Sequence, residues 1–408
     1  MKILQINTIY KYKSTGRTCW EVEKALEAQG HHSLTLHQVG DTTDTKHSYV
    51  VNSKCGYYFH KLMSRLTGLD GYYSFFATRR ALKVIQRYEP DIIHLRNLHG
   101  GYLHLPTLFK FLARYNKPVV YNLHDTWAYT GKCPGYENVH CDKWKRECKK
   151  CPQWKKYPKS YFFDRSNKIF RDKKRWYSGI NNMTVVGVSD YMKTESLQSA
   201  LFQGRRVERI YNWIDLDSFR PYDEKQNKET REKYGLSDGF LVIGVSSYWK
   251  KNTEYEEICA LAKELGEEAH VCLVGGVDIK LPHANMYHIP NLDSMEELAR
   301  IYSSADAFVS TSTTESFGKV AAEALACGVP AVVYASTGIK EIPGSDCGGI
   351  VDKHDIMKMK EKLLEIKEKG KKCYISACRK RAEELFNYME NAKQLINLYY
   401  NILGINNK

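Results

Sequence analysis

Residues 307–334 read AFVSTSTTESFGKVAAEALACGVPAVVY. The stretch begins and ends with short apolar runs, at 307–310 and 331–334, and carries an alanine-rich helical pattern at 319–327 between them. Gly328 and Pro330 are residues that end helices. A strand, a helix and a second strand in this order form a right-handed crossover unit, so the stretch predicts two neighbouring strands of a parallel sheet.

The same alternation extends outward in both directions, which predicts the α/β class with doubly wound parallel sheets. An uncharged run at 241–245 is typical of a strand buried on both faces. The tail from 361 to 403 is almost continuously helical in pattern. Further strands are expected at 3–6, 33–37, 92–95, 119–122, 184–188 and 270–274, and further helices at 18–29, 73–87, 106–115, 161–177 and 254–265.

The length of 408 residues exceeds one ordinary hydrophobic core and predicts two domains. Pro221 and the polar run that follows it interrupt the pattern and mark the join. We expect a first Rossmann-like domain at 1–212 and a second at 213–387, with a C-terminal helix at 388–408 that packs back on the first. Two such domains facing across a cleft would bind ligands at the carboxyl ends of their strands.

The composition excludes a disordered chain and a membrane-spanning one. Hydrophobic residues make up 43% and charged residues 26%. No stretch approaches the roughly 18 uncharged apolar residues of a spanning helix. The start, MKILQINTIY, lacks the longer apolar run and cleavage site of a secretory leader, so a cytoplasmic location is expected.

The formal net charge of +14, with a pI near 9.0, predicts attraction to polyanions or anionic membranes. Between Asp142 and Arg175, fourteen basic residues stand against four acids. A solvated face is the plain explanation, and a surface for lipid headgroups or phosphates is the functional one. On the second, Lys155, Lys156, Lys173 and Lys174 would contribute to binding anionic vesicles. The fourteen are Lys143, Lys145, Arg146, Lys149, Lys150, Lys155, Lys156, Lys159, Arg165, Lys168, Arg171, Lys173, Lys174 and Arg175.

The loop and helix at 311–327 carry two glutamates with distinct predicted surroundings. Ser316 or a neighbour would cap a helix that begins near Gly318, which leaves backbone N–H groups open to an anion such as a diphosphate. Glu315 precedes this helix and Glu323 lies about a turn and a half along it. A carboxylate accepts two hydroxyl hydrogen bonds, as vicinal sugar hydroxyls require. The alternative is a structural helix that happens to carry two acids.

The whole string from Glu315 to Pro330 closely resembles the E-x7-E signature of the retaining glycosyltransferases of family 4, which have the GT-B fold. The resemblance extends along the chain and is most specific here. It implies that Glu315 holds hydroxyls of a donor sugar and that Glu323 holds the ribose. It also implies that the backbone at Ser316, Phe317 and Gly318 lies against the donor.

The resemblance indicates His124 as a second catalytic residue, besides Glu315. His124 ends the strand at 119–122 and stands beside Asp125 and Trp127. The family has an aspartate-flanked histidine here that reaches the donor near the transferred sugar. A lone histidine is more often a satisfied structural residue, but the strand-end position favours a role in the site.

Three further positions are placed by the resemblance. Gly16, in a loop after the first strand, is similar to the glycine at which the family brings backbone close to phosphate and acceptor. Gly275 and Ile289 fall where the family forms the pocket for the nucleotide base.

The sequence departs from the family at the diphosphate. Where the family has an arginine and, five residues later, a lysine, this chain has Tyr248 and Thr253. Lys250 and Lys251 are the cations close enough to replace them. The alternative is that both are ordinary surface lysines with no role in the site.

The chain has 12 cysteines, eight of which are scattered and are expected to be small buried residues. The other four read Cys133-x7-Cys141-x6-Cys148-x2-Cys151. In a cytoplasmic chain, clustered thiols favour a metal or a redox role over disulfides. Two alternatives stay open: a structural zinc ion held by four thiolates, or four free thiols.

The resemblance implies transfer of a sugar from a UDP- or GDP-linked donor to a hydroxyl, with the anomeric configuration retained. It implies no catalytic metal and no nucleophile, because the departing diphosphate takes the acceptor's proton. The expected acceptor is a glycan or a polyprenyl-diphosphate-linked glycan in surface polysaccharide assembly, such as capsule or lipopolysaccharide. The enzyme would lie peripherally on the inner face of the membrane.

Two other functions fit parts of the sequence. A nucleotide-sugar epimerase of the same fold would share the base pocket but would not need the two glutamates. A nucleic-acid-binding protein would explain the charge, yet the chain has no aromatic-basic RNA motif, so no nucleic-acid partner is expected.

Overall fold

The computed structural model describes residues 1–278, 280–292 and 294–405. The chain divides into two compact units, each built on its own parallel sheet. Unit 1 comprises 1–210 and 392–408, and unit 2 comprises 211–391. The sequence placed these boundaries at 212/213 and 387/388, and the last three residues of the expected helix at 388–408 lie outside the described residues.

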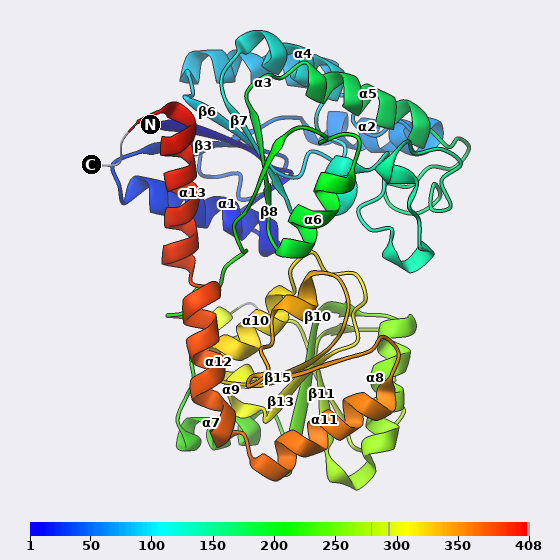
Figure 1. Ribbon diagram of the computed structural model, residues 1–408, viewed down its shortest axis with the longest axis vertical. Coiled ribbons are helices and arrows are strands. Elements are labelled where there is room, and N and C mark those ends of the chain that lie inside the picture. Colours follow the sequence, from blue (N-terminus) through cyan, green and yellow to red (C-terminus); the bar gives the residue numbers. More distant parts are fainter. Residues whose placement is uncertain (279, 293, 406–408) are drawn as a thin grey trace. The chain divides into compact units, whose positions relative to one another are not determined.

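Unit 1 contains a seven-stranded sheet in the order β5-β3-β1-β6-β7-β8-β9, and every strand pair in it is parallel. Helices α3, α4 and α5 lie along one face of this sheet, and α1 lies on the other (Figure 1). The strands are β1 (Lys2–Ile6), β3 (His32–His37), β5 (Ser48–Val50), β6 (Ile92–Leu95), β7 (Val119–Leu123), β8 (Met183–Gly187) and β9 (Arg206–Arg209), with a separate pair β2 (Ile9–Tyr10) and β4 (Val39–Gly40). The helices are α1 (Lys13–Glu27), α2 (Lys54–Thr67), α3 (Phe75–Tyr88), α4 (Leu105–Tyr115), α5 (Ser166–Ser178) and α6 (Asp190–Gln198).

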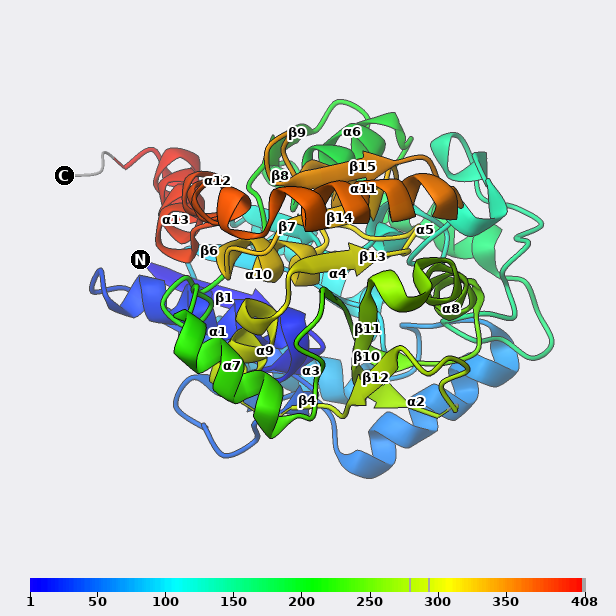
Figure 2. The ribbon, with the colours of Figure 1, turned by 90° about the horizontal axis from the view of Figure 1, so that it is seen from below.

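Unit 2 contains a six-stranded parallel sheet in the order β12-β11-β10-β13-β14-β15. Helices α8 and α11 cover one face, and α9 and α10 cover the other (Figure 2). The strands are β10 (Leu241–Trp249), β11 (His270–Val277), β12 (Met286–Ile289), β13 (Ala307–Ser310), β14 (Ala331–Tyr334) and β15 (Gly348–Val351). The helices are α7 (Glu224–Lys233), α8 (Thr253–Leu265), α9 (Met295–Ser304), α10 (Lys319–Ala326), α11 (Ile356–Lys369) and α12 (Lys372–Leu385). The last helix, α13 (Tyr388–Leu403), begins in unit 2 and continues into unit 1.

The predicted α/β class and the two doubly wound sheets are confirmed. The stretch that opened the sequence forms β13, α10 and β14, and β13 and β14 pair in parallel with Phe308 opposite Ala331. Strands β10, β13 and β14 are nearly free of exposed side chains at their centres, as expected of strands covered on both faces.

The end of the chain returns to unit 1. Residues of α13 from Ala392 onward belong to that unit. The Tyr399 hydroxyl lies 2.7 Å from His94 Nδ1 on β6, and the Tyr400 hydroxyl lies 2.7 Å from His31 Nε2. These contacts tie the helix to β6, the central strand of the first sheet, and to the residue before β3.

One expected helix starts later than predicted. The sequence placed a helix at 161–177, but α5 begins only at Ser166, after a non-helical segment in which the Asp164 carboxylate accepts from Ser166 N at 2.9 Å. Helices α2, α6, α7 and α9 were not predicted, and in α2 the apolar residues do not face the core. In the described part of the chain, no helix is both long enough and apolar enough to cross a membrane.

Candidate active site

Glu315 lies in the loop that joins β13 to α10, at the carboxyl edge of the second sheet. Its backbone is held at both ends of the residue: the Glu315 N–H donates to Thr337 Oγ1 at 2.9 Å, and its carbonyl accepts from Gly338 N at 2.8 Å. The Ser312 hydroxyl lies 3.4 Å from Glu315 Oε1. The loop is therefore fixed by the segment after β14 before any ligand arrives.

Glu315 shares this edge with a second carboxylate that the sequence did not single out. Ser312 Oγ also donates to Glu254 Oε1 at 3.1 Å, and Glu254 lies in the first turn of α8. Burial, and then the negative charge of Glu254, raise the pKa of Glu315 to about 7. An acid with this pKa exchanges its proton near neutrality and gains from hydrogen-bond donors such as sugar hydroxyls.

Helix α10 begins at Lys319, and Gly318 is its N-cap residue. The sequence predicted Ser316 or a neighbour as the cap, and Gly318 occupies the cap position with φ of 97° and without a side-chain cap. A Cβ at Gly318 would lie 2.8 Å from Ile339 Cγ1, so only glycine fits both the backbone and the space. Because glycine brings no capping side chain, the first N–H groups of α10 depend on other acceptors, and an anion is a suitable one.

Glu323 and Phe317 are buried parts of this segment. Glu323 is 6% exposed, and the Tyr302 hydroxyl donates to its Oε2 at 3.1 Å. Phe317 is 2% exposed and packs against Phe386 with ring centroids 5.3 Å apart. The Phe317 side chain belongs to the core of unit 2, which leaves its backbone for the predicted contact with the donor.

Lys250 and Lys251 follow β10 and are both exposed. They immediately precede Asn252, the N-cap of α8, whose side chain accepts from Tyr255 N at 3.1 Å. The Thr311 hydroxyl donates to the Glu254 carbonyl at 2.8 Å, so the loops after β10 and β13 touch. The structure thus brings two lysines and two helix N-termini to the edge that carries Glu315.

Gly275 and Ile289, the two residues predicted for the base pocket, differ in how they could contribute to it: one through its backbone, the other only through a buried side chain. Gly275 has φ of 128°, and a Cβ there would lie 1.8 Å from the Ser246 carbonyl oxygen. Its own carbonyl accepts from His288 Nε2 at 2.7 Å. Ile289 is only 1% exposed, so its side chain packs in the core of unit 2 instead of lining an open pocket.

His124 follows β7 in unit 1 and meets a buried arginine. Arg96 Nη1 lies 3.1 Å from His124 Nε2, and Asn122 Nδ2 lies 3.3 Å from the same nitrogen. A guanidinium only donates, so Nε2 is the acceptor and the imidazole proton sits on Nδ1. Arg96 is 1% exposed and its Nε donates to Gln5 Oε1 at 3.1 Å, which fixes the guanidinium in place.

Asp125 and His99 form an ion pair next to His124. His99 Nε2 lies 2.7 Å from Asp125 Oδ2, and Asp125 Oδ1 accepts from Trp127 N at 2.9 Å. Burial would lower the pKa of His99, but the Asp125 carboxylate outweighs burial and raises it. His99 Nδ1 faces the Tyr157 hydroxyl at 2.8 Å. The carboxyl ends of the neighbouring strands β6 and β7 therefore carry a polar cluster.

The sequence placed Gly16 in a loop, but in the structure it lies in a helix. Helix α1 begins at Lys13, so Gly16 is in its first turn and is buried. A Cβ at Gly16 would lie 2.9 Å from Ile9 Cγ2 and 3.2 Å from the Tyr10 nitrogen. The residue is needed for the close packing of α1 on β2.

The basic stretch at 142–175 is divided by the fold. Lys173 is fully buried, its ammonium group 3.3 Å from the centre of the Trp127 ring, and it donates to the carbonyls of Trp127 and Thr130. Burial lowers its pKa to about 7. The expectation that Lys173 contacts vesicles is corrected, whereas Lys155, Lys156 and Lys174 are exposed.

The four clustered cysteines are free thiols. Cys133 and Cys148 are buried, and burial raises the pKa of each to about 12. Cys148 Sγ accepts from Gly131 N at 3.1 Å. A tetrahedral zinc ion with Zn–S distances of about 2.3 Å needs its sulfurs within about 4 Å of one another. Among the described residues, no three of Cys133, Cys141, Cys148 and Cys151 lie within 4.8 Å of one another, so their arrangement does not fit the ion.

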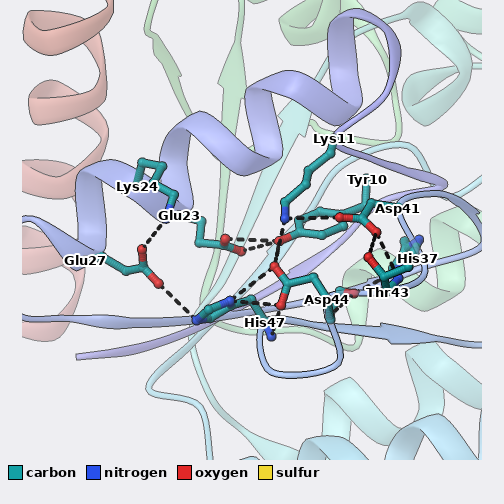
Figure 3. A network of polar contacts seen from close by, with 11 residues as sticks. Tyr10, Lys11, Glu23, Lys24, Glu27, His37, Asp41, Thr43, Asp44 and His47 are labelled. Carbon is teal, nitrogen blue, oxygen red and sulfur yellow. Dashed lines mark hydrogen bonds and ion pairs between the residues drawn. The ribbon is translucent and has the colours of Figure 1, made fainter.

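A different group of possible metal ligands consists of Glu23 and Glu27 on α1 and His47 before β5, with one ligand atom of each within 4.8 Å of the others. Figure 3 shows that these side chains are engaged with their neighbours. Tyr10 Oη donates to Glu23 at 3.0 Å, and His47 bridges Glu27 and Asp44. The network joins α1 to the segment before β5 and is explained as a structural one.

Comparison with known proteins agrees with this geometry. The model described as Glycosyltransferase Family 4 matches residues 15–218, and the model described as Glycosyl transferases group 1 matches 226–384. The chain belongs to glycosyltransferase family 4. The family 4 match spans unit 1 with its His124 cluster, and the group 1 match spans the Glu315 loop.

Relatives of this family 4 glycosyltransferase are distant over long alignments and closer over short ones. It is 22% identical over 321 residues to WcaC of Escherichia coli (strain K12), a glycosyl transferase assigned to colanic acid biosynthesis, covering 77% of each chain. It is 44% identical over 166 residues to a D-inositol 3-phosphate glycosyltransferase of Mycobacterium sp. (strain JLS), covering 37% of each chain.

Solved structures share the GT-B fold. Sucrose-phosphate synthase from Thermosynechococcus elongatus superposes with a TM-score of 0.71 at 16% identity, covering 99% of both chains. HepE of Anabaena, in complex with UDP-glucose, superposes with a TM-score of 0.65 at 15% identity, covering 98% of this chain and 100% of HepE. The family 4 protein is thus a glycosyltransferase, and the epimerase and nucleic-acid-binding alternatives are not favoured.

Three participants in the site were missed by sequence reasoning. Glu254 carries a signal, since acids are favoured in the first turn of a helix, where they complement the helix dipole. Arg96 follows an apolar strand, and its burial beside His124 depends on strand order that one sequence does not show. Thr337 holds the Glu315 loop from a neighbouring strand and likewise has no local signature.

Proposed function

We propose that this glycosyltransferase moves a sugar from a nucleoside-diphosphate donor to a hydroxyl, with retention of the anomeric configuration. The observation that carries the proposal is the Glu315 loop, which ends on the glycine-capped N-terminus of α10. It combines a carboxylate for sugar hydroxyls with backbone N–H groups for a phosphate. The complex of the distant HepE with UDP-glucose supports a donor of this class.

The donor's charged part would bind at the N-termini of α10 and α8. Lys250 and Lys251 would add two cations there and so replace the arginine and lysine that the family commonly has. Glu323, fixed by Tyr302, would hold the ribose, and the backbone at Gly275 would approach the base. In this arrangement the leaving diphosphate gains negative charge where helix ends and cations stabilise it.

Glu315 would orient the sugar and would not attack it. The mechanism is front-face transfer: the acceptor oxygen bonds to the anomeric carbon on the side from which the diphosphate leaves. The bond to the diphosphate breaks with its electron pair, and the diphosphate oxygen takes the acceptor's proton. Catalysis then rests on positioning and electrostatics, and this proposal requires no metal.

His124 would donate a hydrogen bond from Nδ1 to a hydroxyl of the transferred sugar. The Arg96 and Asn122 donors at Nε2 support this, because they leave Nδ1 as the protonated nitrogen. A neutral histidine donor beside the anomeric centre avoids placing a second full charge near the oxocarbenium-like transition state.

We further propose a setting in surface polysaccharide assembly, with a glycan or polyprenyl-diphosphate-linked acceptor at the inner face of the membrane. The similarity to WcaC over 77% of both chains supports this setting. The net charge of +14 supports attraction to anionic lipid.

A panel of UDP-, GDP-, ADP- and TDP-linked sugars, screened for a rise in unfolding temperature, tests the donor class. One donor should stabilise the protein far more than its free sugar does, and Glu315→Gln should abolish the sugar-dependent part of this rise. Proton NMR of the transferred sugar then reports retention or inversion. An inverted anomer, or no stabilisation by any nucleotide sugar, contradicts the proposal.

A further inference from the structure

Helix α2 exposes its apolar side chains and buries its polar ones. Tyr58, Phe59 and Leu62 are 67%, 54% and 53% exposed, whereas His60 and Ser64 are buried. His60 is satisfied inside the fold, because its Nδ1 lies 2.6 Å from Ser74 Oγ and its Nε2 accepts from Gly71 N. A helix of a globular domain normally shows the opposite pattern. The exposed face therefore needs an explanation outside the core of unit 1.

A second set of exposed aromatic residues adjoins the end of α2. Tyr161, Phe162 and Phe163 are consecutive and are 42%, 64% and 49% exposed. The Tyr161 N–H donates to the Arg65 carbonyl at 2.7 Å. A Cβ on Gly68, the C-cap of α2, would lie 2.5 Å from the Phe163 carbonyl oxygen. The two sets are thus neighbours, and α2 lies at the edge of unit 1 (Figure 2).

Cations surround these rings and have no acidic partner. Lys61 lies 4.2 Å from the centre of the Tyr57 ring. Lys159 and Arg165 lie 5.1 and 5.0 Å from the ring centres of Tyr161 and Phe163. Within the described ranges, none of these cations, nor Arg65 of α2, forms an ion pair with an acid.

The only acid among residues 54–67 and 157–165 is Asp164. Its carboxylate is turned into the fold, where it accepts from Cys151 N at 2.7 Å and Ser166 N at 2.9 Å. The aromatic–basic surface, defined as Tyr58, Phe59, Lys61, Leu62, Arg65, Lys159, Tyr161, Phe162, Phe163 and Arg165, is therefore apolar and positive without compensation.

We propose that the aromatic–basic surface binds the headgroup region of an anionic lipid bilayer. Aromatic side chains are stable at the boundary of headgroups and acyl chains, and lysine and arginine stems extend from there to lipid phosphates. A second copy of the chain is a poorer occupant, because a symmetric contact would place two sets of unpaired cations against each other. The charge of this surface complements anionic lipid.

The inference identifies the residues that would attach the protein to the membrane. It rests on the membrane setting stated under the proposed function. It differs from the sequence-based expectation, which relied on the charge of the basic run at 142–175. Lys173 of that run is buried, and Lys168 is paired with Asp172 at 2.8 Å. The surface shares only residues 159–165 with the run, and the rest of its apolar and basic side chains come from α2, which the run does not include.

The test uses the full chain and sedimentation with vesicles of equal parts phosphatidylglycerol and phosphatidylcholine, compared with pure phosphatidylcholine. The apolar variant Phe59→Gln/Leu62→Gln/Phe162→Gln should bind the mixed vesicles at least about tenfold more weakly than the wild type. Its matched control is Leu197→Gln/Met357→Gln, which changes side chains that are 48% and 54% exposed elsewhere. That control should bind as the wild type does.

Charge is tested separately with Lys61→Gln/Arg65→Gln. At low salt this variant should lose about fivefold in binding for each removed charge, and the loss should shrink as salt rises. Lys110→Gln/Arg114→Gln, on the exposed side of α4, is the control for net charge. All substituted side chains are solvent-exposed or lie on the surface, and circular dichroism with thermal unfolding verifies that each variant is folded.

The outcomes separate the inference from the proposed function. Equal binding by the wild type, the apolar variant and the charge variant overturns the inference, and weaker binding by Lys155→Gln/Lys156→Gln/Lys174→Gln alone transfers the site to the basic run. If the wild type does not bind anionic vesicles, the membrane setting in the proposed function is overturned together with the inference. If the apolar variant converts a dimer to a monomer in sedimentation velocity, the surface binds a second copy instead. Stabilisation by nucleotide sugars reports the donor site independently.

Discussion

The Arg96 guanidinium lies 3.1 Å from Nε2 of His124 inside the first unit, and among the described residues it pairs with no carboxylate. Nη2 of the same guanidinium is buried and has no hydrogen-bond partner in the described part of the chain. A buried cation is costly unless other groups compensate it. Its retention next to a strand-end histidine indicates that it serves that histidine.

Arg96 should hold the His124 proton on Nδ1, because a guanidinium only donates and its partner is Nε2. Arg96→Gln replaces it with an amide that can also accept, so the tautomer with the proton on Nε2 should become populated. Nitrogen–proton correlation NMR of the histidines, assigned with His124→Gln, measures the tautomer. A wild-type His124 with its proton on Nε2 contradicts the assignment.

How much of this site the sequence could predict depends on how local each feature is. The strand, helix and strand around Glu315 are encoded by adjacent residues, and they formed as expected, with Gly318 at the cap position in place of a side-chain cap. The contact between Arg96 and His124 joins two residues that are 28 positions apart and follow different strands. A search for apolar residues on a core-facing side does not find α2, because its apolar face points outward. Gly16 was misplaced for a related reason: glycine suggests a loop, but here it allows a helix to touch a strand.

The raised pKa of Glu315 makes a prediction about stability and pH. Its carboxyl has a pKa of about 7 in the fold and an ordinary value near 4.5 when unfolded. A raised pKa means that its contribution to stability is complete below the unfolded value and is lost as the pH rises through about 7. Glu315→Gln should therefore gain on the wild type by up to about 3 kcal/mol between pH 4.5 and pH 8.

Donor-free unfolding midpoints of both proteins across this pH range measure that gain. Glu264→Gln, an exposed glutamate on α8, is the matched control and should show no such trend. A constant difference between Glu315→Gln and the wild type at all pH values would show that Glu315 is already ionised at neutral pH.

Gly318 should tolerate no side chain. In Gly318→Ala, the methyl group would meet Ile339 at about 2.8 Å and would hold alanine at φ of 97°. The strain should cost about 1–3 kcal/mol and weaken donor binding, because the N-terminus of α10 must shift. Gly204→Ala is a useful comparison, since Gly204 also has positive φ but has nothing within 4 Å of the added carbon. Equal losses of unfolding temperature in the two variants would leave backbone strain alone as the cause and remove the packing argument.

Lys250 and Lys251 should bind the donor's diphosphate if they replace the missing family cations. Lys250→Gln/Lys251→Gln should weaken binding of the best-stabilising nucleotide sugar by about tenfold at low salt, since each exposed cation contributes up to about 1 kcal/mol. The loss should diminish at high salt, and binding of the corresponding nucleoside, which has no phosphate, should not change. Lys353→Gln/Lys369→Gln removes two exposed lysines elsewhere in unit 2 and controls for net charge. Isothermal titration of wild type and variants at two salt concentrations decides the matter: equal losses for nucleotide sugar and nucleoside would mean that the two lysines shape the site without contacting phosphate.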